Sequence, residues 1–281
     1  MREQSFDEIS DSYPVLFLDA FGVLRNSDGL IPGSLDVMDR LRARGKDIYI
    51  LTNDASRSPE ELSRVYVDAE ARQMVPAKRI ISSGMLASEH LAQQIKSGQV
   101  AYLGSEKSAE YIRNAGLAPV PIEACTEETT LAAIALLDDE GFNWMEGLNR
   151  ALNLLRAEPL PVVVANGDLA YPAKGGLEAV AIGSLAGLLE KILDTDFVHC
   201  GKPGEVMFSK AFEKAKEDHP GLRRGDVLMV GDTLQTDIKG GRDFGLDTLL
   251  VLSGHTQASR LVELVKKLDI EPTFFADSIL T

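Results

Sequence analysis

Short apolar runs recur along the chain and alternate with amphipathic stretches. The apolar runs are typical of buried strands and lie at residues 15–19, 47–52, 100–104, 131–137, 161–166, 226–232 and 247–252. The amphipathic stretches predict helices at residues 34–44, 59–72, 84–95, 108–114, 145–156, 205–217 and 236–244. The most apolar long segment, residues 175–193, predicts one further, buried helix. Regular alternation of strand and helix favours an α/β fold with parallel sheets and crossover helices.

Three of the predicted strands end in polar residues. Asp19 closes the first, Thr52 and Asn53 close the second, and Asp232 closes a later one. In an open parallel sheet, ligands bind beyond the carboxyl ends of the strands, so these side chains are expected to converge. Lys202, in the tight setting "HCGKPG", is a candidate cation for the same site.

Two polar breaks divide the chain. They lie at residues 96–100 and 194–197 and flank a middle region whose strands lack the polar endings described above. The simplest architecture is a core formed by residues 1–98 and 197–281, with residues 99–196 inserted as an α/β cap. The core would hold roughly 180 residues, enough for its own hydrophobic centre.

The net charge and the composition limit the kinds of molecule that this protein is expected to bind. The 281 residues carry a formal net charge of −14, so the chain should repel nucleic acid and anionic membranes. No apolar run approaches the roughly 18 residues that span a bilayer, and the polar N-terminus resembles no targeting segment. Cys125 and Cys200 match no metal-site spacing and are expected to be reduced thiols in a cytoplasmic protein. An anionic substrate would need a local concentration of positive charge.

The motifs resemble those of a known family. Asp19 in "FLDAFGVL", Thr52 in "ILTNDASRS", Lys202 in "GKPG", and Asp232 with Asp237 in "GDTLQTDIKGG" match, in order, the four motifs of the haloacid dehalogenase-like (HAD) superfamily. The segments "GLIPGS", "GKPGEVMF" and "VLSGHT" are similar to its NagD-type, class IIA branch. The resemblance covers nearly the whole chain and implies a Rossmann-like, doubly wound core sheet with a large α/β cap.

The resemblance also implies a reaction. Most members transfer a phosphoryl group to the first aspartate and then hydrolyse the aspartyl-phosphate, which makes Asp19 the expected nucleophile, assisted by Thr52 and Lys202. A carboxylate needs no deprotonation at pH 7 before it attacks phosphorus. Mg²⁺, which prefers oxygen ligands, would screen the two anions. Its expected protein ligands are Asp19, the Phe21 carbonyl, Asp232 and Asp237. Asp237 could instead pair with Lys202 or cap the next helix.

The expected partner is a small phosphorylated substrate, with no nucleic acid and no membrane, and similar proteins commonly dimerise through the cap. The residues expected to contact the substrate are Phe21, Gly22, Asn53, Asp54, Arg57, Asn166, Asp168 and Thr233. For Asn166 and Asp168, in the cap loop "VVVANGDLAYP", the alternative is a plain turn. Arg57 could equally be an exposed arginine at a helix start.

Phe21 departs from the pattern of most phosphatases in this superfamily. They carry a second aspartate at this position, which protonates the leaving oxygen and later activates water. General acid–base catalysis of this kind is worth about 10²–10⁴-fold. Substrates with good leaving groups would need no acid, or another residue could supply it, with Asp54, Asp168 and His255 as candidates. Hydrolysis could also be slow or lost. An aromatic residue here resembles a little-characterised subgroup of the class IIA branch.

The sequence thus predicts a Mg²⁺-dependent phosphatase that works through Asp19, and a preference for good leaving groups is one of the accounts of Phe21. The alternative is a catalytically impaired binding or regulatory protein on the same scaffold. Metal-free dehalogenation, which also lacks the second aspartate, fits Asp232 and the large cap less well.

Overall fold

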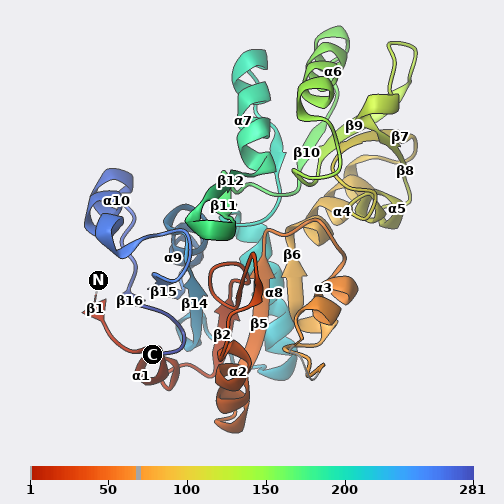
Figure 1. The fold of residues 1–281 in the computed structure, drawn as a ribbon. Coiled ribbons are helices and arrows are strands. Elements are labelled where there is room, and N and C mark those ends of the chain that lie inside the picture. Colours follow the sequence, from red (N-terminus) through yellow and green to blue (C-terminus); the bar gives the residue numbers. More distant parts are fainter. Residues whose placement is uncertain (1, 68–70) are drawn as a thin grey trace.

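Two parallel sheets organise the chain (Figure 1). The computed structural model describes residues 2–67 and 71–281. The larger sheet has the order β1-β16-β15-β14-β2-β5-β6, and all of its neighbouring strands are parallel. Its strands are β1 (Arg2–Glu3), β2 (Val15–Leu18), β5 (Asp47–Thr52), β6 (Ile80–Ser82), β14 (Val227–Gly231), β15 (Asp247–Val251) and β16 (Phe274–Ala276). The predicted α/β fold with a doubly wound core sheet is confirmed.

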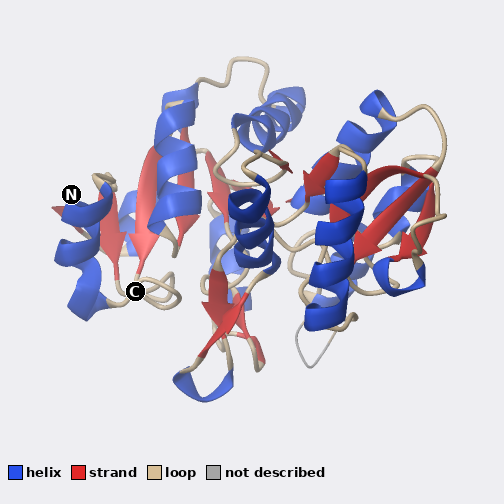
Figure 2. Ribbon diagram, turned by 90° about the horizontal axis from the view of Figure 1, so that it is seen from above, coloured by secondary structure: helices blue, strands red, loops and turns tan. Residues whose placement is uncertain are grey.

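Helices bury both faces of the larger sheet, as Figure 2 shows from above. Alternate residues of β2 point to opposite faces: Phe17 packs toward one set of helices, and Leu16 and Leu18 toward the other. The first set comprises α4 (Ser83–Gln94), α8 (Glu205–Asp218) and α9 (Lys239–Phe244), and the second comprises α1 (Phe6–Ser10), α2 (Ser34–Ala43) and α3 (Pro59–Val65). α10 (Leu261–Leu268) packs beside β15 in a smaller cluster. A small hairpin, β3 (Arg25–Asn26) with β4 (Gly29–Leu30), follows β2.

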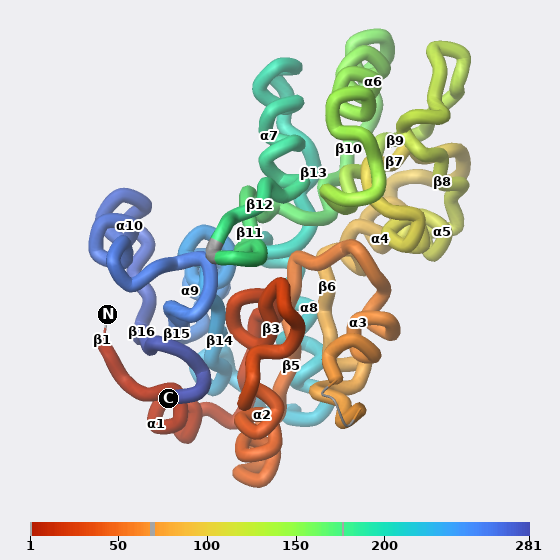
Figure 3. The backbone as a smooth tube through the Cα atoms, viewed as in Figure 1, coloured from red at the N-terminus to blue at the C-terminus, as the bar shows by residue number. Residues whose placement is uncertain are grey.

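The smaller sheet forms the cap and has the order β13-β10-β9-β7-β8. Its strands are β7 (Gln99–Leu103), β8 (Ala118–Pro121), β9 (Leu131–Leu136), β10 (Val162–Val164) and β13 (Val198–His199). α6 (Trp144–Ala157) and α7 (Ile182–Leu193) cover its outer face, while α5 (Glu110–Asn114) lies with α4 on the other (Figure 3). The sheet therefore runs from Gln99 to His199, and the exact limits of the predicted cap stay a prediction.

Two predicted helices are longer than the helices in the structure. The helix predicted over residues 59–72 ends at Val65, and residues 68–70 lie outside the described part. The helix predicted over residues 175–193 begins only at Ile182. Gly175 has a φ of 74°, which leaves the helical region, and the residues around it fold back as a hairpin. Leu188 and Ile192 of α7 are each half exposed, so the prediction of a fully buried helix is wrong.

The hairpin that replaces the start of that helix connects the cap to the core. It consists of β11 (Ala170–Pro172) and β12 (Glu178–Val180), which are antiparallel and lie over the core beside the carboxyl edge of its sheet (Figure 1). The Tyr171 ring meets the Phe21 ring edge-on, with centroids 5.9 Å apart. Glu178 Oε1 lies 3.1 Å from His255 Nδ1 of the core. The hairpin thus covers the chain segments that follow β2 and β15.

No helix in the described part of the chain is long and apolar enough to cross a bilayer.

Candidate active site

The carboxyl edges of the two sheets face one cavity of about 430 Å³. The loops after β2 and β5 line it from the core, and the loops after β7, β9 and β10 line it from the cap, together with the hairpin. The core side chains are Asp19, Phe21, Arg25, Thr52, Asn53, Asp54, Ala55, Ser56 and Arg57, and the cap side chains are Ser105, Lys107, Asp138, Asp139, Glu140, Asn166, Asp168 and Tyr171. Because parallel strands present their polar endings at one edge, two facing sheets enclose a polar chamber.

A buried ion cluster lies behind one wall of this cavity, and Asp19 is the member of the cluster that lines it. Asp19 follows β2 directly, and its backbone N–H still donates to Val230 O of β14 at 2.9 Å. Lys202 Nζ lies 2.6 Å from Asp19 Oδ1 and 2.7 Å from Asp237 Oδ1. Ala20 N donates to the same Asp19 oxygen at 2.7 Å. Asp19 Oδ1 is therefore fixed by two donors, and the described residues offer no hydrogen bond to Oδ2.

Asp232 is held by its own loop and by two glycines. Its carboxylate accepts hydrogen bonds from Thr233 Oγ1 at 3.0 Å and from His255 N at 2.7 Å. A Cβ on Gly22 would lie 2.0 Å from Asp232 Oδ2, and one on Gly254 would lie 1.9 Å from it. Only glycine fits at these two points. Gly22 and Thr233, expected to contact substrate, contact Asp232 here.

The three aspartates form a set of ligands that suits a divalent cation. One carboxylate oxygen of each of Asp19, Asp232 and Asp237 lies within 4.8 Å of the others, and all three side chains are buried. With Lys202 protonated, the four groups carry a net charge of −2, which a divalent cation would balance. Hard oxygen donors are the ligands that Mg²⁺ and Ca²⁺ prefer.

Burial sets the proton affinities in this cluster. It raises the pKa of Asp19 well above its usual range, against the attraction of Lys202. It raises the pKa of Asp232 to about 7, and the nearby Asp237 adds to the shift. Burial alone would lower the pKa of Lys202, but Asp19 and Asp237 raise it above its ordinary value, so the ammonium stays charged. A cation bound among the carboxylates would favour their ionised forms.

Asn53 joins the core to the cap. Its Oδ1 accepts from Lys202 N at 2.8 Å, and its Nδ2 donates to Lys202 O at 3.1 Å and to Asp168 Oδ1 at 2.9 Å. Asp168 N in turn donates to Asn166 Oδ1 at 2.8 Å. The polar ending of β5 and the predicted cap loop thus meet at the cavity. Burial raises the pKa of Asp168.

The remaining predicted residues lie around this contact. Thr52 Oγ1 accepts from Asp54 N at 3.2 Å, and Asp54 Oδ1 accepts from Ser56 N and Ser56 Oγ at 2.8 and 2.6 Å. Arg57 lines the cavity. His255 is not among its lining residues, because the side chain turns toward Glu178 of the hairpin.

Several lining residues were not found from the sequence. They are Arg25, Ala55, Ser56, Ser105, Lys107, Asp138, Asp139, Glu140 and Tyr171. Asp138 and Asp139 follow β9, and the same rule of polar strand endings would have identified them had it been applied to the cap. Tyr171 precedes the segment that was predicted to be one long helix, so the hairpin that brings its ring against Phe21 was not predicted.

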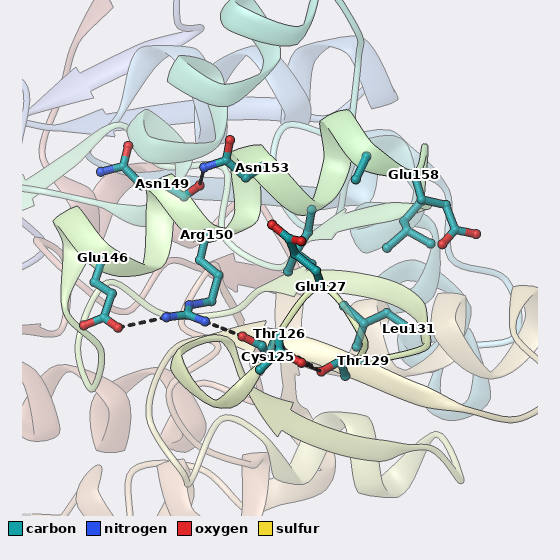
Figure 4. Close-up of a pocket in the computed structure, with 13 residues that line it drawn as sticks. Cys125, Thr126, Glu127, Thr129, Leu131, Glu146, Asn149, Arg150, Asn153 and Glu158 are labelled. Carbon is teal, nitrogen blue, oxygen red and sulfur yellow. Dashed lines mark hydrogen bonds and ion pairs between the residues drawn. The ribbon is translucent and has the colours of Figure 1, made fainter.

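A second cavity, of about 510 Å³, lies within the cap and shares no lining residue with the first (Figure 4). It is bounded by α6 and residues 125–131. Its one arginine, Arg150, is already paired, because the guanidinium contacts the Cys125 carbonyl and Glu146 Oε1. The other charged residues that line it are glutamates, so these walls offer no unpaired positive charge to an anionic ligand.

Comparison with known proteins agrees with this geometry. Residues 16–118 match the family described as "Haloacid dehalogenase-like hydrolase", and residues 199–281 match a second HAD-hydrolase-like family. Chronophin from Bos taurus is 30% identical over 97% of the chain and 93% of its own length.

Solved structures extend the comparison. A "possible sugar phosphatase" of the HAD superfamily from Cytophaga hutchinsonii has 42% identity and a TM-score of 0.93, covering 100% of this chain and 99% of that one. Glycerol phosphate phosphatase Rv1692 from Mycobacterium tuberculosis, solved in complex with magnesium, has 25% identity and a TM-score of 0.77, covering 99% and 78%. NagD from E. coli, at 22% identity and a TM-score of 0.72 over 95% and 97%, shares the fold. The chain belongs to the haloacid dehalogenase-like hydrolases.

Proposed function

We propose that this protein is a Mg²⁺-dependent phosphatase that hydrolyses a small phosphorylated metabolite through a phosphorylated Asp19. The observation that carries the proposal is the Asp19 carboxylate, which borders the cavity with one oxygen fixed by Lys202 and Ala20 N. Relatives named as phosphatases, among them the magnesium complex from M. tuberculosis, support it.

The chain's own groups divide the work. Oδ2 of Asp19, which the described residues leave without a donor, is the atom that would bond to phosphorus as the ester P–O bond breaks. Lys202 places a buried positive charge beside the transferred group. The Thr52 hydroxyl and Asn53 amide, at the end of β5, would donate to phosphoryl oxygens. Water then releases phosphate and restores Asp19.

Asp19, Asp232, Asp237 and the Phe21 carbonyl would hold the Mg²⁺. When bound, the ion reduces the repulsion between an anionic nucleophile and an anionic substrate. Phe21 does not prevent this, because a backbone carbonyl is independent of its side chain.

Removal of the metal should abolish turnover and lower stability. Chelation by EDTA is expected to stop hydrolysis of p-nitrophenyl phosphate, and added Mg²⁺ should restore it. Because Mg²⁺ would relieve repulsion among buried carboxylates, it should raise the unfolding temperature, with a gain of about 2.7 kcal/mol at 100 times its Kd. Full activity after exhaustive chelation, together with an unchanged unfolding temperature, would contradict the metal site.

Gly254, which lies against the Asp232 carboxylate, offers a test of the same site that changes none of the proposed metal ligands. Gly254→Ala is expected to displace the Asp232 carboxylate, since its Cβ would lie 1.9 Å from Oδ2. The Mg²⁺ concentration for half-maximal activity should rise about 10–100-fold, the usual scale for disturbed ligand positioning. The control is Gly187→Ala in α7, where an added Cβ meets nothing within 4 Å. Equal Mg²⁺ requirements for both variants would count against the assignment.

A substrate screen tests the function as a whole. Purified protein with Mg²⁺ should hydrolyse at least one class among aryl, acyl and alkyl phosphates. Phe21 favours a competing function, a phosphate-binding or regulatory protein without turnover. Tight binding of Mg²⁺ and phosphate without hydrolysis of any class would support that alternative and refute the phosphatase.

A further inference from the structure

A missing proton donor is the main departure of this site from a complete phosphatase. Phe21 lines the cavity two residues after Asp19, where its ring can neither give nor take a proton. The ring is held in place by Tyr171 of the cap, at 5.9 Å, and by the Arg25 guanidinium, 5.7 Å from its centroid. It is a fixed apolar contact, and any acid must come from another wall.

The contact at Phe21 leads to a carboxylate loop of the cap. Tyr171 Oη donates to Asp139 Oδ2 at 2.9 Å, so the ring that packs on Phe21 also binds the loop after β9. β9 is the middle strand of the cap sheet, and Asp138 and Asp139 follow its end. The loop is therefore linked through Tyr171 to residue 21, the position where most phosphatases of this superfamily are expected to carry their acid.

Asp138 is held firmly in that loop. Its backbone N–H donates to Leu103 O of β7 at 3.3 Å. The loop packs tightly on the next cap loop, since a Cβ on Gly141 would lie 2.5 Å from Ser105 Cα. The carboxylate is half-buried at the wall of the cavity that contains Asp19. A group that delivers a proton needs such fixed placement.

Three other aspartates at the cavity accept hydrogen bonds from side chains, although burial still raises the pKa of two of them, Asp139 and Asp168. Asp54 accepts from Ser56, Asp168 accepts from Asn53, and Asp139 accepts from Tyr171. Hydrogen bonds donated to a carboxylate stabilise its charged form.

Asp138 differs from these three. Among the described residues no side chain donates to its carboxyl group, and the Glu140 backbone N–H is its one donor. Burial raises the pKa of Asp138 to about 7, and repulsion from Asp139 and Asp54 acts in the same direction. A carboxyl group in this state is protonated in a large fraction of molecules near neutral pH and loses its proton readily, which suits an acid that must later act as a base.

We propose that Asp138 of the cap supplies the acid–base catalysis that Phe21 cannot. The inference rests on the proposed phosphatase function. As Asp19 Oδ2 bonds to phosphorus and the ester P–O bond breaks, the Asp138 proton moves to the departing oxygen and gives the free alcohol. The Asp138 carboxylate then takes a proton from the attacking water. The oxygen of this water bonds to phosphorus, the bond between phosphorus and Asp19 breaks, and inorganic phosphate leaves.

The test compares two leaving groups in Asp138→Asn. With an alkyl phosphate such as glycerol 2-phosphate, kcat/KM should fall at least about 100-fold, because an alkoxide is a poor leaving group without an acid. With p-nitrophenyl phosphate, kcat/KM should change less than about threefold, because p-nitrophenolate leaves unprotonated. The second step still lacks its base, so this substrate should show a burst of one p-nitrophenolate per enzyme followed by slow turnover. Asp196→Asn, at an exposed position of the cap away from the cavity, is the matched control.

The outcomes separate the two levels of the proposal. Equal losses of kcat/KM on both substrates would overturn the role of Asp138 and leave the phosphatase function standing. Failure of the unaltered protein with Mg²⁺ to hydrolyse any aryl, acyl or alkyl phosphate would overturn the function itself. In Phe21→Asp, a new carboxyl group should add less than about threefold to alkyl phosphate turnover. A gain of about 100-fold would show that the acid is absent from the natural site, and would also overturn the proposal.

Discussion

Asp19→Asn should reduce the turnover of every phosphate ester by at least about 10⁴-fold, the scale seen when an enzyme loses its nucleophile. The amide has nearly the volume of the carboxylate and can still accept a hydrogen bond from Lys202 through its oxygen. The variant should therefore fold, and the loss should appear in kcat with p-nitrophenyl phosphate. Its leaving group needs no acid, so this substrate reports on the nucleophile alone.

The matched control exchanges a carboxylate that takes no part in the site. Asp36→Asn lies on α2 with its side chain largely exposed and should retain full activity. Circular dichroism and thermal unfolding would show that Asp19→Asn keeps its fold. Substantial p-nitrophenyl phosphate turnover by a folded Asp19→Asn protein would refute the covalent route through Asp19. Another group would then have to be the nucleophile.

The core of the site was predictable because its residues obey one rule. Asp19, Thr52 and Asp232 each end a strand of the same parallel sheet, and the structure places these strands beside one another in the order β14-β2-β5. Alternation of apolar runs and helices is a strong local pattern, so the four central strands β15, β14, β2 and β5 also followed from the sequence, whereas the short outer strands β1, β16 and β6 did not. Lys202 was assigned by its motif and lies within 2.7 Å of two carboxylates.

The cap side of the site was predicted only in part: Asn166 and Asp168 were expected at the site, whereas Asp138 and Asp139 were missed although they too follow the end of a strand. Asp138 and Asp139 are two of 43 acidic residues in a chain with a net charge of −14, so their sequence alone does not set them apart. Their importance arises only when the cap sheet turns its carboxyl edge toward the core, which is a property of tertiary packing. Residues 170–180 were obscured because an apolar run resembles a buried helix, whereas Gly175 redirects the chain into a hairpin that brings Tyr171 over Phe21.

Lys202→Met tests the opposite side of the Asp19 cluster and should have the largest effect on stability. Lys202 is buried and lies within 2.7 Å of Asp19 and Asp237, so its removal leaves buried carboxylates without their counter-charge. Breaking one partner of a buried ion pair typically costs about 3–5 kcal/mol of unfolding free energy. Methionine is unbranched and flexible enough to fill the same channel, so the loss would reflect charge rather than a cavity.

The comparison variant for Lys202→Met is Lys210→Met. Lys210 pairs with Glu89 across the partly exposed surface between α8 and α4, where an ion pair contributes at most about 1 kcal/mol. Urea unfolding in EDTA should therefore show a large loss for Lys202→Met and a small one for Lys210→Met. Saturating Mg²⁺ should recover part of the first loss and none of the second, because a cation among Asp19, Asp232 and Asp237 replaces some of the missing positive charge. Equal losses in the two variants would mean that the cluster is not the electrostatic centre of the core, and the metal site built on it would fail with it.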